Sequence, residues 1–300
     1  MYGSAAVLLW STVASAFKLS LRYLSNLQLL FLSDVFSTLI LAIILISSGG
    51  FGQVFRCTKK EYLRSFLLGI LNPFLYYLIL FRAYELLPAQ EAQPLNYTWA
   101  ITLALLSVPL LRQKIGAADI TGLFLSYFGV LIISTRGHIT GFNISEPAGV
   151  ALALGSTLIW ALYWIFNTSD SRQPILCLFM SFAFSLAPTG LCYGLFHSFQ
   201  IPDMRGILGA AYVGAFEMSI TYVLWLMAMR YSENTAKVAG LIFVSPFLSL
   251  MFIHFLVGEP IRGSTVSGLA LIIAGLLVQR CGSGVQTNSK SDSPPSQRGQ

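Results

Sequence analysis

Glu217 is a carboxylic acid inside an otherwise apolar stretch, GAFEMSITYVLW, at residues 214–225. A charged side chain at the centre of a bilayer costs roughly 2.5 to 3.5 kcal/mol even on the most lenient insertion scale, so a helix that carries one normally has a use for it. A carboxyl group in this position can exchange a proton for a substrate or hold a cationic substrate. The alternative interpretation is a neutral buried acid that is hydrogen-bonded to a neighbouring helix.

Asn72 occupies the matching position in a second apolar stretch, GILNPFLYYLILFRA, at residues 69–83. A shift of 145 residues aligns the two stretches and sets Asn72 on Glu217. Pro73 removes a helical N–H donor, which can kink the helix and leave a carbonyl group unpaired. We therefore expect both polar side chains to face one central cavity. Alternatively, Asn72 hydrogen-bonds only the backbone that Pro73 loosens.

Aromatic, hydroxyl and amide side chains at helical spacing extend this predicted site. Residues three or four apart are neighbours on a helix, which puts Thr221 and Trp225 on the face of Glu217, and Tyr76 on that of Asn72. The predicted substrate-binding residues are Asn72, Glu217, Tyr76, Asn96, Trp99, Trp10, Trp160, Tyr163, Thr221 and Trp225. For the aromatic members, the alternative role is packing or an interfacial belt.

Glu91 and Lys237 are opposite charges that align at a shift of 146 residues, near opposite ends of the expected bundle. We predict that they are gate residues that form alternative ion pairs, with Glu217 as the coupling group. The alternative is that both charges sit at helix ends and reach toward lipid headgroups. Lys18 and Asp34 both fall toward the outer face of the first predicted hairpin, where we expect a structural ion pair, and the alternative is a coupling site.

The elements that position these residues are predicted to be transmembrane helices. Hydrophobic residues make up 55% of the 300 residues, charged residues make up 10%, and the mean hydropathy is +0.72. A soluble domain would carry about 25% charged residues. Stretches long enough to span a bilayer, which takes about 20 residues, recur at 3–19, 28–48, 62–86, 88–111, 116–135, 147–167, 174–197, 204–229, 234–257 and 263–280. The sequence thus predicts an all-α polytopic membrane protein with ten helices.

The distribution of Lys and Arg predicts the orientation. With the N-terminus in the cytoplasm, twelve basic residues fall in inner connections and six in outer ones. The positive-inside rule then places both termini in the cytoplasm, in the inner or plasma membrane of the cell. The net charge of +6 is explained by this topology and requires no nucleic-acid partner.

An internal repeat organises the chain into residues 1–137 and residues 147–281, followed by a polar tail at 282–300 that we expect to be disordered. Each half contains five predicted helices. Because five is odd, the second half enters the membrane from the opposite side, and inverted repeats of this kind are typical of secondary transporters. Gly122 and Gly129 align with Gly268 and Gly275, and small residues seven apart lie on one helix face and permit close helix packing.

The order and duplication of several motifs resemble a known family. The motifs are WSTVASAFK and WALYWIFN at the start of the halves, AYELLPAQEA and RYSENTAKVAG before helices 4 and 9, and VGEPIRGSTVSGLALIIAG at the end. Together they resemble the EamA-type branch of the drug/metabolite transporter superfamily. The resemblance implies a carrier for small metabolites, with helices 1–4 and 6–9 around a central cavity. The segment LNYTWA is similar to part of the branch that exports aromatic and other amino acids.

These observations predict a secondary transporter that moves a small metabolite by alternating access. An amino acid or related zwitterion is the expected substrate, export is the expected direction, and protons are the candidate coupling ion. No G-x-x-x-x-G-K-[ST], H-E-x-x-H or G-x-S-x-G motif occurs in the sequence, and we expect no cofactor, metal site or catalytic residue. The alternatives are a membrane-embedded enzyme acting on a lipid-linked substrate and a carrier for nucleotide-like or drug-like solutes. The oligomeric state is not predicted.

Overall fold

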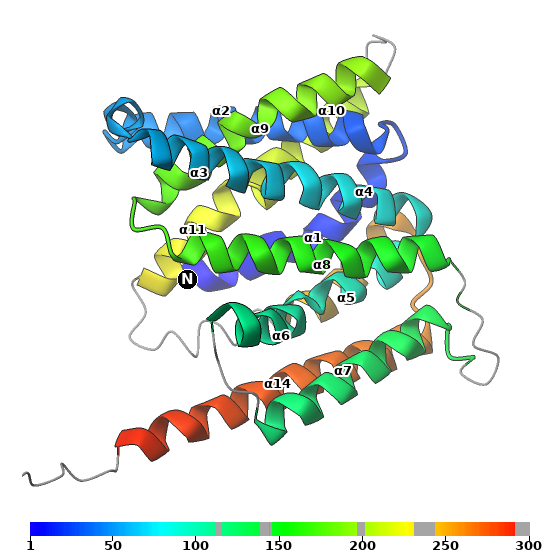
Figure 1. The fold of residues 1–300 in the computed structure, drawn as a ribbon. Coiled ribbons are helices and arrows are strands. Elements are labelled where there is room, and N and C mark those ends of the chain that lie inside the picture. Colours follow the sequence, from blue (N-terminus) through cyan, green and yellow to red (C-terminus); the bar gives the residue numbers. More distant parts are fainter. Residues whose placement is uncertain (112–115, 139–143, 145, 197–201, 231–243, 292–300) are drawn as a thin grey trace, which may run out of the picture.

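A computed structural model describes the chain except for residues 112–115, 139–143, 145, 197–201, 231–243 and 292–300. The regular elements of the described residues are helices that run roughly along one common direction (Figure 1). The elements before residue 140 are α1 (Tyr2–Ser20), α2 (Asn26–Ser47), η1 (Phe51–Arg56), α3 (Lys59–Gly69), η2 (Ile70–Leu75), α4 (Tyr76–Leu86), α5 (Ala89–Tyr97), α6 (Trp99–Leu111) and α7 (Ala117–Ser134). The later elements are α8 (Pro147–Thr168), α9 (Pro174–Phe196), α10 (Met204–Tyr212), η4 (Val213–Glu217), α11 (Ile220–Arg230), α13 (Ser245–Phe252), η6 (Ile253–Val257) and α14 (Gly263–Ser291).

Five of the helical segments are long and apolar enough to cross a membrane: Asn26–Ser47, Lys59–Leu86, Pro147–Asn167, Pro174–Phe196 and Met204–Trp225. Shorter apolar helices occur at Ile120–Ser134, Ser245–Val257 and Gly263–Gln279. The chain is therefore a multi-pass helical membrane protein.

Local sequence signals set the beginnings of several helices. Ser25 and Gln28 form a capping box at the start of α2, and Thr58 and Glu61 form another at the start of α3. In both, the side chains satisfy backbone N–H groups that have no intrahelical partner. Pro147 begins α8, where the missing N–H costs nothing.

Two long spans change helical geometry at matching positions. The π-helical segment η2 separates α3 from α4, and Asn72 within it has an extended backbone with φ −143° and ψ 121°. The π-helical segment η4 separates α10 from α11 and ends at Glu217. Segments of this kind often mark functional sites because they turn side chains away from the regular helical register.

The helices α7 and α14 form a closely packed pair along one side of the bundle (Figure 1). A side-chain carbon on Gly129 would collide with the backbone oxygen of Gly268, and one on Gly122 would collide with that of Gly275. The absence of side chains is thus what allows the two backbones to touch, as the glycine spacing predicted.

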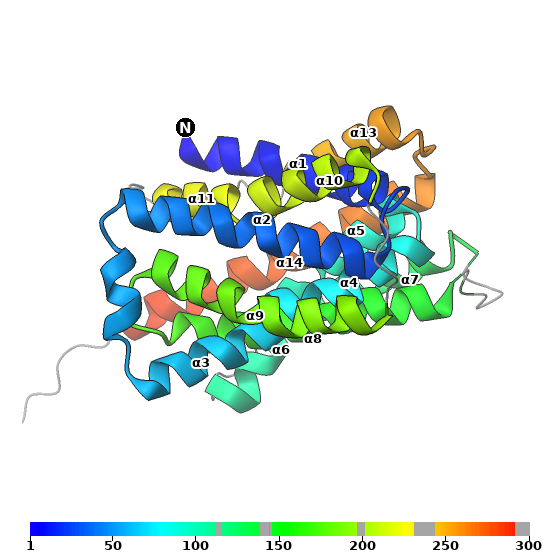
Figure 2. The same cartoon turned by 90° about the horizontal axis from the view of Figure 1, so that it is seen from above.

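The N-terminus and the C-terminal part of α14 lie at the same end of the bundle in both views (Figures 1 and 2). The polar composition predicted a disordered tail from residue 282 onward. Helix α14 instead continues to Ser291, so residues 282–291 are helical. The stretch contains no proline before Pro294, and polar residues do not by themselves end a helix. Residues 292–300 lie outside the described part of the chain.

Candidate functional site

A cavity of about 350 Å³ lies inside the bundle, within the usual size range of small-molecule sites. Its walls come from α1, α4, α5, α6, α8, η4 and α11, so residues from both halves of the chain enclose one space. The residues that line it are Trp10, Val13, Ala14, Phe17, Tyr76, Leu80, Tyr84, Gln93, Asn96, Tyr97, Trp99, Leu103, Trp160, Trp164, Glu217, Tyr222 and Trp225.

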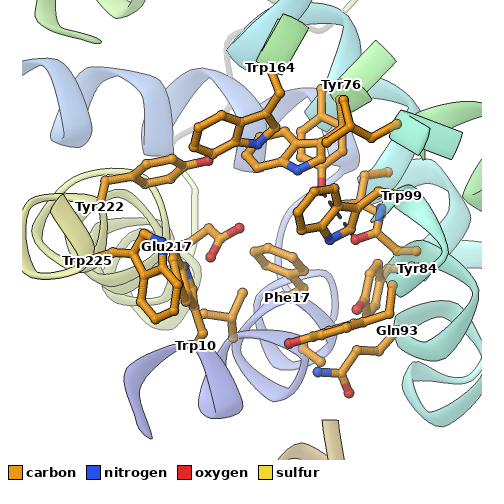
Figure 3. Close-up of a pocket in the computed structure, with 17 residues that line it drawn as sticks. Trp10, Phe17, Tyr76, Tyr84, Gln93, Trp99, Trp164, Glu217, Tyr222 and Trp225 are labelled. Carbon is orange, nitrogen blue, oxygen red and sulfur yellow. Dashed lines mark hydrogen bonds between the residues drawn. The ribbon is translucent and has the colours of Figure 1, made fainter. Parts of the chain in front are cut away.

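Aromatic rings form a continuous wall around this cavity (Figure 3). The ring centroids of Trp10 and Trp225 are 5.4 Å apart, and those of Trp10 and Tyr222 are 6.0 Å apart. Tyr222 lies 6.2 Å from Trp160, which lies 4.5 Å from Tyr76. All four pairs are tilted or edge-to-face, and none is the face-to-face sandwich that aromatic quadrupoles disfavour. The wall of the cavity is therefore largely aromatic.

Glu217 directs its carboxylate into the cavity from the end of η4 (Figure 3). The hydroxyl of Tyr77 donates a hydrogen bond of 3.0 Å to Oε1 of Glu217, and the indole of Trp10 lies beside the same carboxylate. Of the two polar residues expected to face a central cavity, the structure thus places Glu217 at the cavity. Its closest described partners are aromatic side chains, so it is poised to meet an additional hydrogen-bond donor or a cation.

A group of polar side chains occupies another part of the wall. The hydroxyl of Tyr76 donates to Oδ1 of Asn96 at 3.3 Å, and Nδ2 of Asn96 donates to Ser156 at 3.0 Å. Gln93 is buried, also lines the cavity, and has an Oε1 atom without a hydrogen-bond partner in the structure. These amides can orient a polar substituent of a bound molecule.

Three predicted binding residues do not line the cavity: Asn72, Tyr163 and Thr221. Asn72 is fully buried beside the hydroxyl of Tyr163, because its extended backbone removes it from the helical face that it was expected to share with Tyr76. Tyr163 packs against Trp160 and Trp164. The hydroxyl of Thr221 donates to the backbone oxygen of Phe216.

The predicted gate residue Glu91 is buried in an ion-pair cluster. Its Oε1 accepts a hydrogen bond of 2.9 Å from Nε of Arg136 and a second bond from the guanidinium of Arg262. Its predicted counterpart Lys237 lies outside the described residues. We call the set Glu91, Arg136 and Arg262 the charge cluster. It joins α5 to the end of α7 and the start of α14.

Further hydrogen bonds, most of them to backbone atoms, join the start of α5 to residues 259–262 at the end of the bundle that holds the charge cluster. Glu259 accepts hydrogen bonds from the backbone N–H groups of Ala89 at 2.9 Å and Gln90 at 3.2 Å, which neutralises the positive end of the α5 dipole. The side chain of Gln90 donates to the backbone oxygen of Pro260 at 2.7 Å and accepts from the backbone N–H of Arg262 at 3.0 Å. The first turn of α5 is thus held directly against the segment before α14.

The prediction of an ion pair between Lys18 and Asp34 is wrong, because each side chain has other partners. The Lys18 ammonium donates to the backbone oxygens of Tyr84 and Leu87, both at 2.7 Å, at the C-terminal end of α4. Asp34 is fully buried, and its Oδ2 accepts hydrogen bonds from the hydroxyls of Ser185 and Thr189 on α9. The two residues lie in different helices, whose rotation about their axes cannot be read from hydropathy.

Several cavity residues were not predicted, although the sequence held a signal for some of them. Phe17 follows Trp10 by seven residues, which is close to two helical turns, and so shares its face. Tyr84 follows Tyr76 by eight residues on the same face. Gln93 precedes Asn96 by one turn. Spacing alone could have included these residues.

Comparisons with known proteins agree with this architecture. An uncharacterized transporter of Archaeoglobus fulgidus is 24% identical over 283 residues, covering 91% of this chain and 95% of the relative. An aromatic amino acid exporter, YddG, of Ancylobacter novellus is 24% identical over 212 residues, covering 70% of this chain and 73% of the relative. One solved crystal structure with 22% sequence identity matches the fold with a TM-score of 0.66 and covers 93% of this chain and 96% of that one.

The profile of one protein family matches most of the chain. It is described as the EamA-like transporter family and matches residues 1–135 and 147–280. The helical membrane fold, the central cavity and this match lead to one conclusion: the chain belongs to the EamA-like transporter family.

Proposed function

We propose that the protein is a secondary transporter that carries a small metabolite through the central cavity by alternating access. The observation that carries this proposal is the cavity itself, whose wall combines Glu217 with aromatic residues from both halves of the chain. A binding site shared between two halves can face each side of the membrane in turn when the halves move relative to each other.

The proposed architecture is ten transmembrane helices in two inverted repeats of five, covering residues 1–137 and 147–281. Two findings support it. The family profile matches the chain in two segments, 1–135 and 147–280. The π-helical segments η2 and η4 interrupt equivalent spans, at Ile70–Leu75 and Val213–Glu217.

The proposed substrate is a metabolite of amino-acid size with an amino group, such as an amino acid or a related zwitterion, and the proposed direction is export. The name of the YddG relative supports this class, since that protein is an aromatic amino acid exporter. Glu217 supplies a counter-charge for an ammonium group, and we propose that it also binds the coupling proton. One carboxylate can bind a proton or a substrate cation, but not both at full strength, which is the basis of exchange.

The charge cluster is the proposed gate at its end of the cavity. Gln93 lines the cavity and Glu91 belongs to the charge cluster, so the two residues are only two positions apart in α5. The ion pairs would have to separate for a substrate to leave by this route. In the proposed orientation this end faces away from the cytoplasm, and both termini are cytoplasmic in the plasma membrane.

Transport of radiolabelled amino acids and of the corresponding amines into proteoliposomes, with and without a pH gradient, tests this function. We expect unchanged solute to accumulate when the gradient is present, and Trp160→Ala to abolish accumulation because the indole contacts several rings of the wall. Gly155→Ala is the matched control, since nothing lies within 4 Å of a side-chain carbon there. Chemical conversion of the solute would indicate an enzyme. A reporter fused after Arg280 that is active only outside the cell would contradict the orientation.

A further inference from the structure

The aromatic rings that line the cavity form a box with the shape and chemistry to hold a flat, cationic guest. Trp10, Trp160, Trp225 and Tyr222 are linked by centroid distances of 5.4 to 6.2 Å, and Trp99 and Trp164 lie 6.5 and 6.0 Å from Trp160. The face of an aromatic ring carries negative potential, and tryptophan attracts a cation most strongly. A wall rich in indole rings therefore favours an ammonium group over a neutral group of the same shape.

The carboxyl group of Glu217 is an acid in this box, and in its ionised form it supplies a full negative charge to a bound cation. It projects from η4 between Trp10 and Phe17 toward the centre of the cavity (Figure 3). Among the lining residues that the structure describes, Glu217 is the charged one. Lys18, near the cavity, already donates to two backbone oxygens, and the guanidinium groups of Arg136 and Arg262 are paired with Glu91.

A carboxylate on the guest would therefore enter an aromatic box without a cationic partner among these residues. Loss of water from an unpaired carboxylate is costly, whereas an ammonium group gains both Glu217 and the ring faces. The amides of Asn96 and Gln93 can accept or donate hydrogen bonds, but they do not balance a charge.

We infer that the cavity selects an aromatic monoamine in its cationic form, so that the ammonium group is recognised and a carboxylate on the same molecule is not. This inference rests on the proposed function, because it takes the cavity as the transport site. It keeps alternating access through the cavity but replaces the zwitterion as the favoured substrate with an amine that has a flat aromatic body and a net charge of one.

Binding of three indole compounds to the purified full-length protein tests the inference. Tryptamine is a cation at neutral pH, tryptophan is a zwitterion, and tryptophol is a neutral molecule of similar shape. We expect tryptamine to bind at least about tenfold more tightly than either of the others, which corresponds to about 1.4 kcal/mol. Glu217→Gln should reduce the preference for tryptamine over tryptophol several-fold, because only the aromatic rings then remain to attract the ammonium group, while binding of tryptophol persists. Glu146→Gln, which removes an exposed carboxylate at the start of α8, is the matched control and should change nothing.

The possible failures are distinguishable. Tighter binding of tryptophan than of tryptamine, with loss in Trp160→Ala, would overturn the inference and leave the cavity as an amino-acid site. A preference for tryptamine over tryptophol that is unchanged in Glu217→Gln would also overturn it. If no indole compound binds, the inference is wrong, and the uptake experiment with Trp160→Ala then decides separately whether the cavity is a transport site.

Discussion

The hydroxyl of Tyr77 on α4 donates a hydrogen bond of 3.0 Å to the carboxylate of Glu217 at the end of η4. The bond joins the first half of the chain to the second, beside the cavity. Tyr77 is itself fully buried and packs against Phe17 and Tyr76. The orientation of the acid is thus set by a residue from the opposite half.

Glu217→Gln should preserve the fold but abolish concentrative, pH-dependent transport. The amide is nearly the same shape and is less costly to bury, but it cannot bind or release a proton.

Tyr77→Phe should slow transport and keep its pH dependence, because the carboxylate loses a positioning bond and remains titratable. Proton-driven uptake and counterflow are the measurements. Full concentrative activity in Glu217→Gln would refute the coupling role.

Glu91→Gln should make the cavity more accessible from the end where α5 begins. The change leaves Arg136 and Arg262 without their shared carboxylate, and breaking a buried charge pair costs several kcal/mol. In a Gln93→Cys background, we expect a membrane-impermeant maleimide to label position 93 several-fold faster. The control is Arg82→Gln, which breaks the more exposed pair between Arg82 and Glu85. Equal labelling rates in the two variants would exclude the charge cluster as a gate.

Gly129→Ala should destabilise the protein by about 1 to 3 kcal/mol, because the added methyl group collides with the backbone of α14 at Gly268. Gly155→Ala is the control within α8, where the methyl group meets open space. There, alanine should be neutral or stabilising by up to about 1 kcal/mol because of its higher helix propensity. The midpoint of thermal unfolding in detergent compares the two variants. Similar midpoints would show that close α7–α14 packing contributes little.

Asp170 should stabilise the connection between α8 and α9 at neutral pH. Hydrogen bonds from the Arg172 side chain lower the pKa of Asp170 from 3.8 to about 2, and Arg64 on α3 lies 3.3 Å from the same carboxylate. A lowered folded-state pKa means that the stabilisation is present above about pH 4 and is lost as the pH falls toward 2. Asp170→Asn should therefore unfold at a lower temperature than the wild type at pH 7.

The difference in unfolding temperature between Asp170→Asn and the wild type should shrink between about pH 4 and pH 2 as the native carboxylate becomes protonated. Glu146→Gln should show no such pH-dependent difference, because the Glu146 side chain makes no capping hydrogen bond at the start of α8. A constant difference for Asp170→Asn over this range would indicate that the amide disturbs packing and that the charge is not important.

Part of the site could be predicted from the sequence, because hydropathy and helical periodicity determine which residues share a helix face. Glu217 faces the cavity, as its place in an apolar helix suggested. Trp10, Trp160, Trp99, Asn96, Tyr76 and Trp225 line the same space. The glycines of α7 and α14 face each other, because a seven-residue spacing fixes a helix face regardless of the partner.

Other relationships required the tertiary structure. The partners of Glu91 come from the ends of α7 and α14, and Lys18 binds the carbonyl end of α4, because contacts between distant helices depend on how the bundle is packed. Asn72 does not line the cavity because its backbone is not helical. The prediction from helical spacing assumed an unbroken helix. Hydropathy and periodicity therefore determined the membrane class and many helix faces, whereas long-range packing and the local breaks decided which polar groups meet.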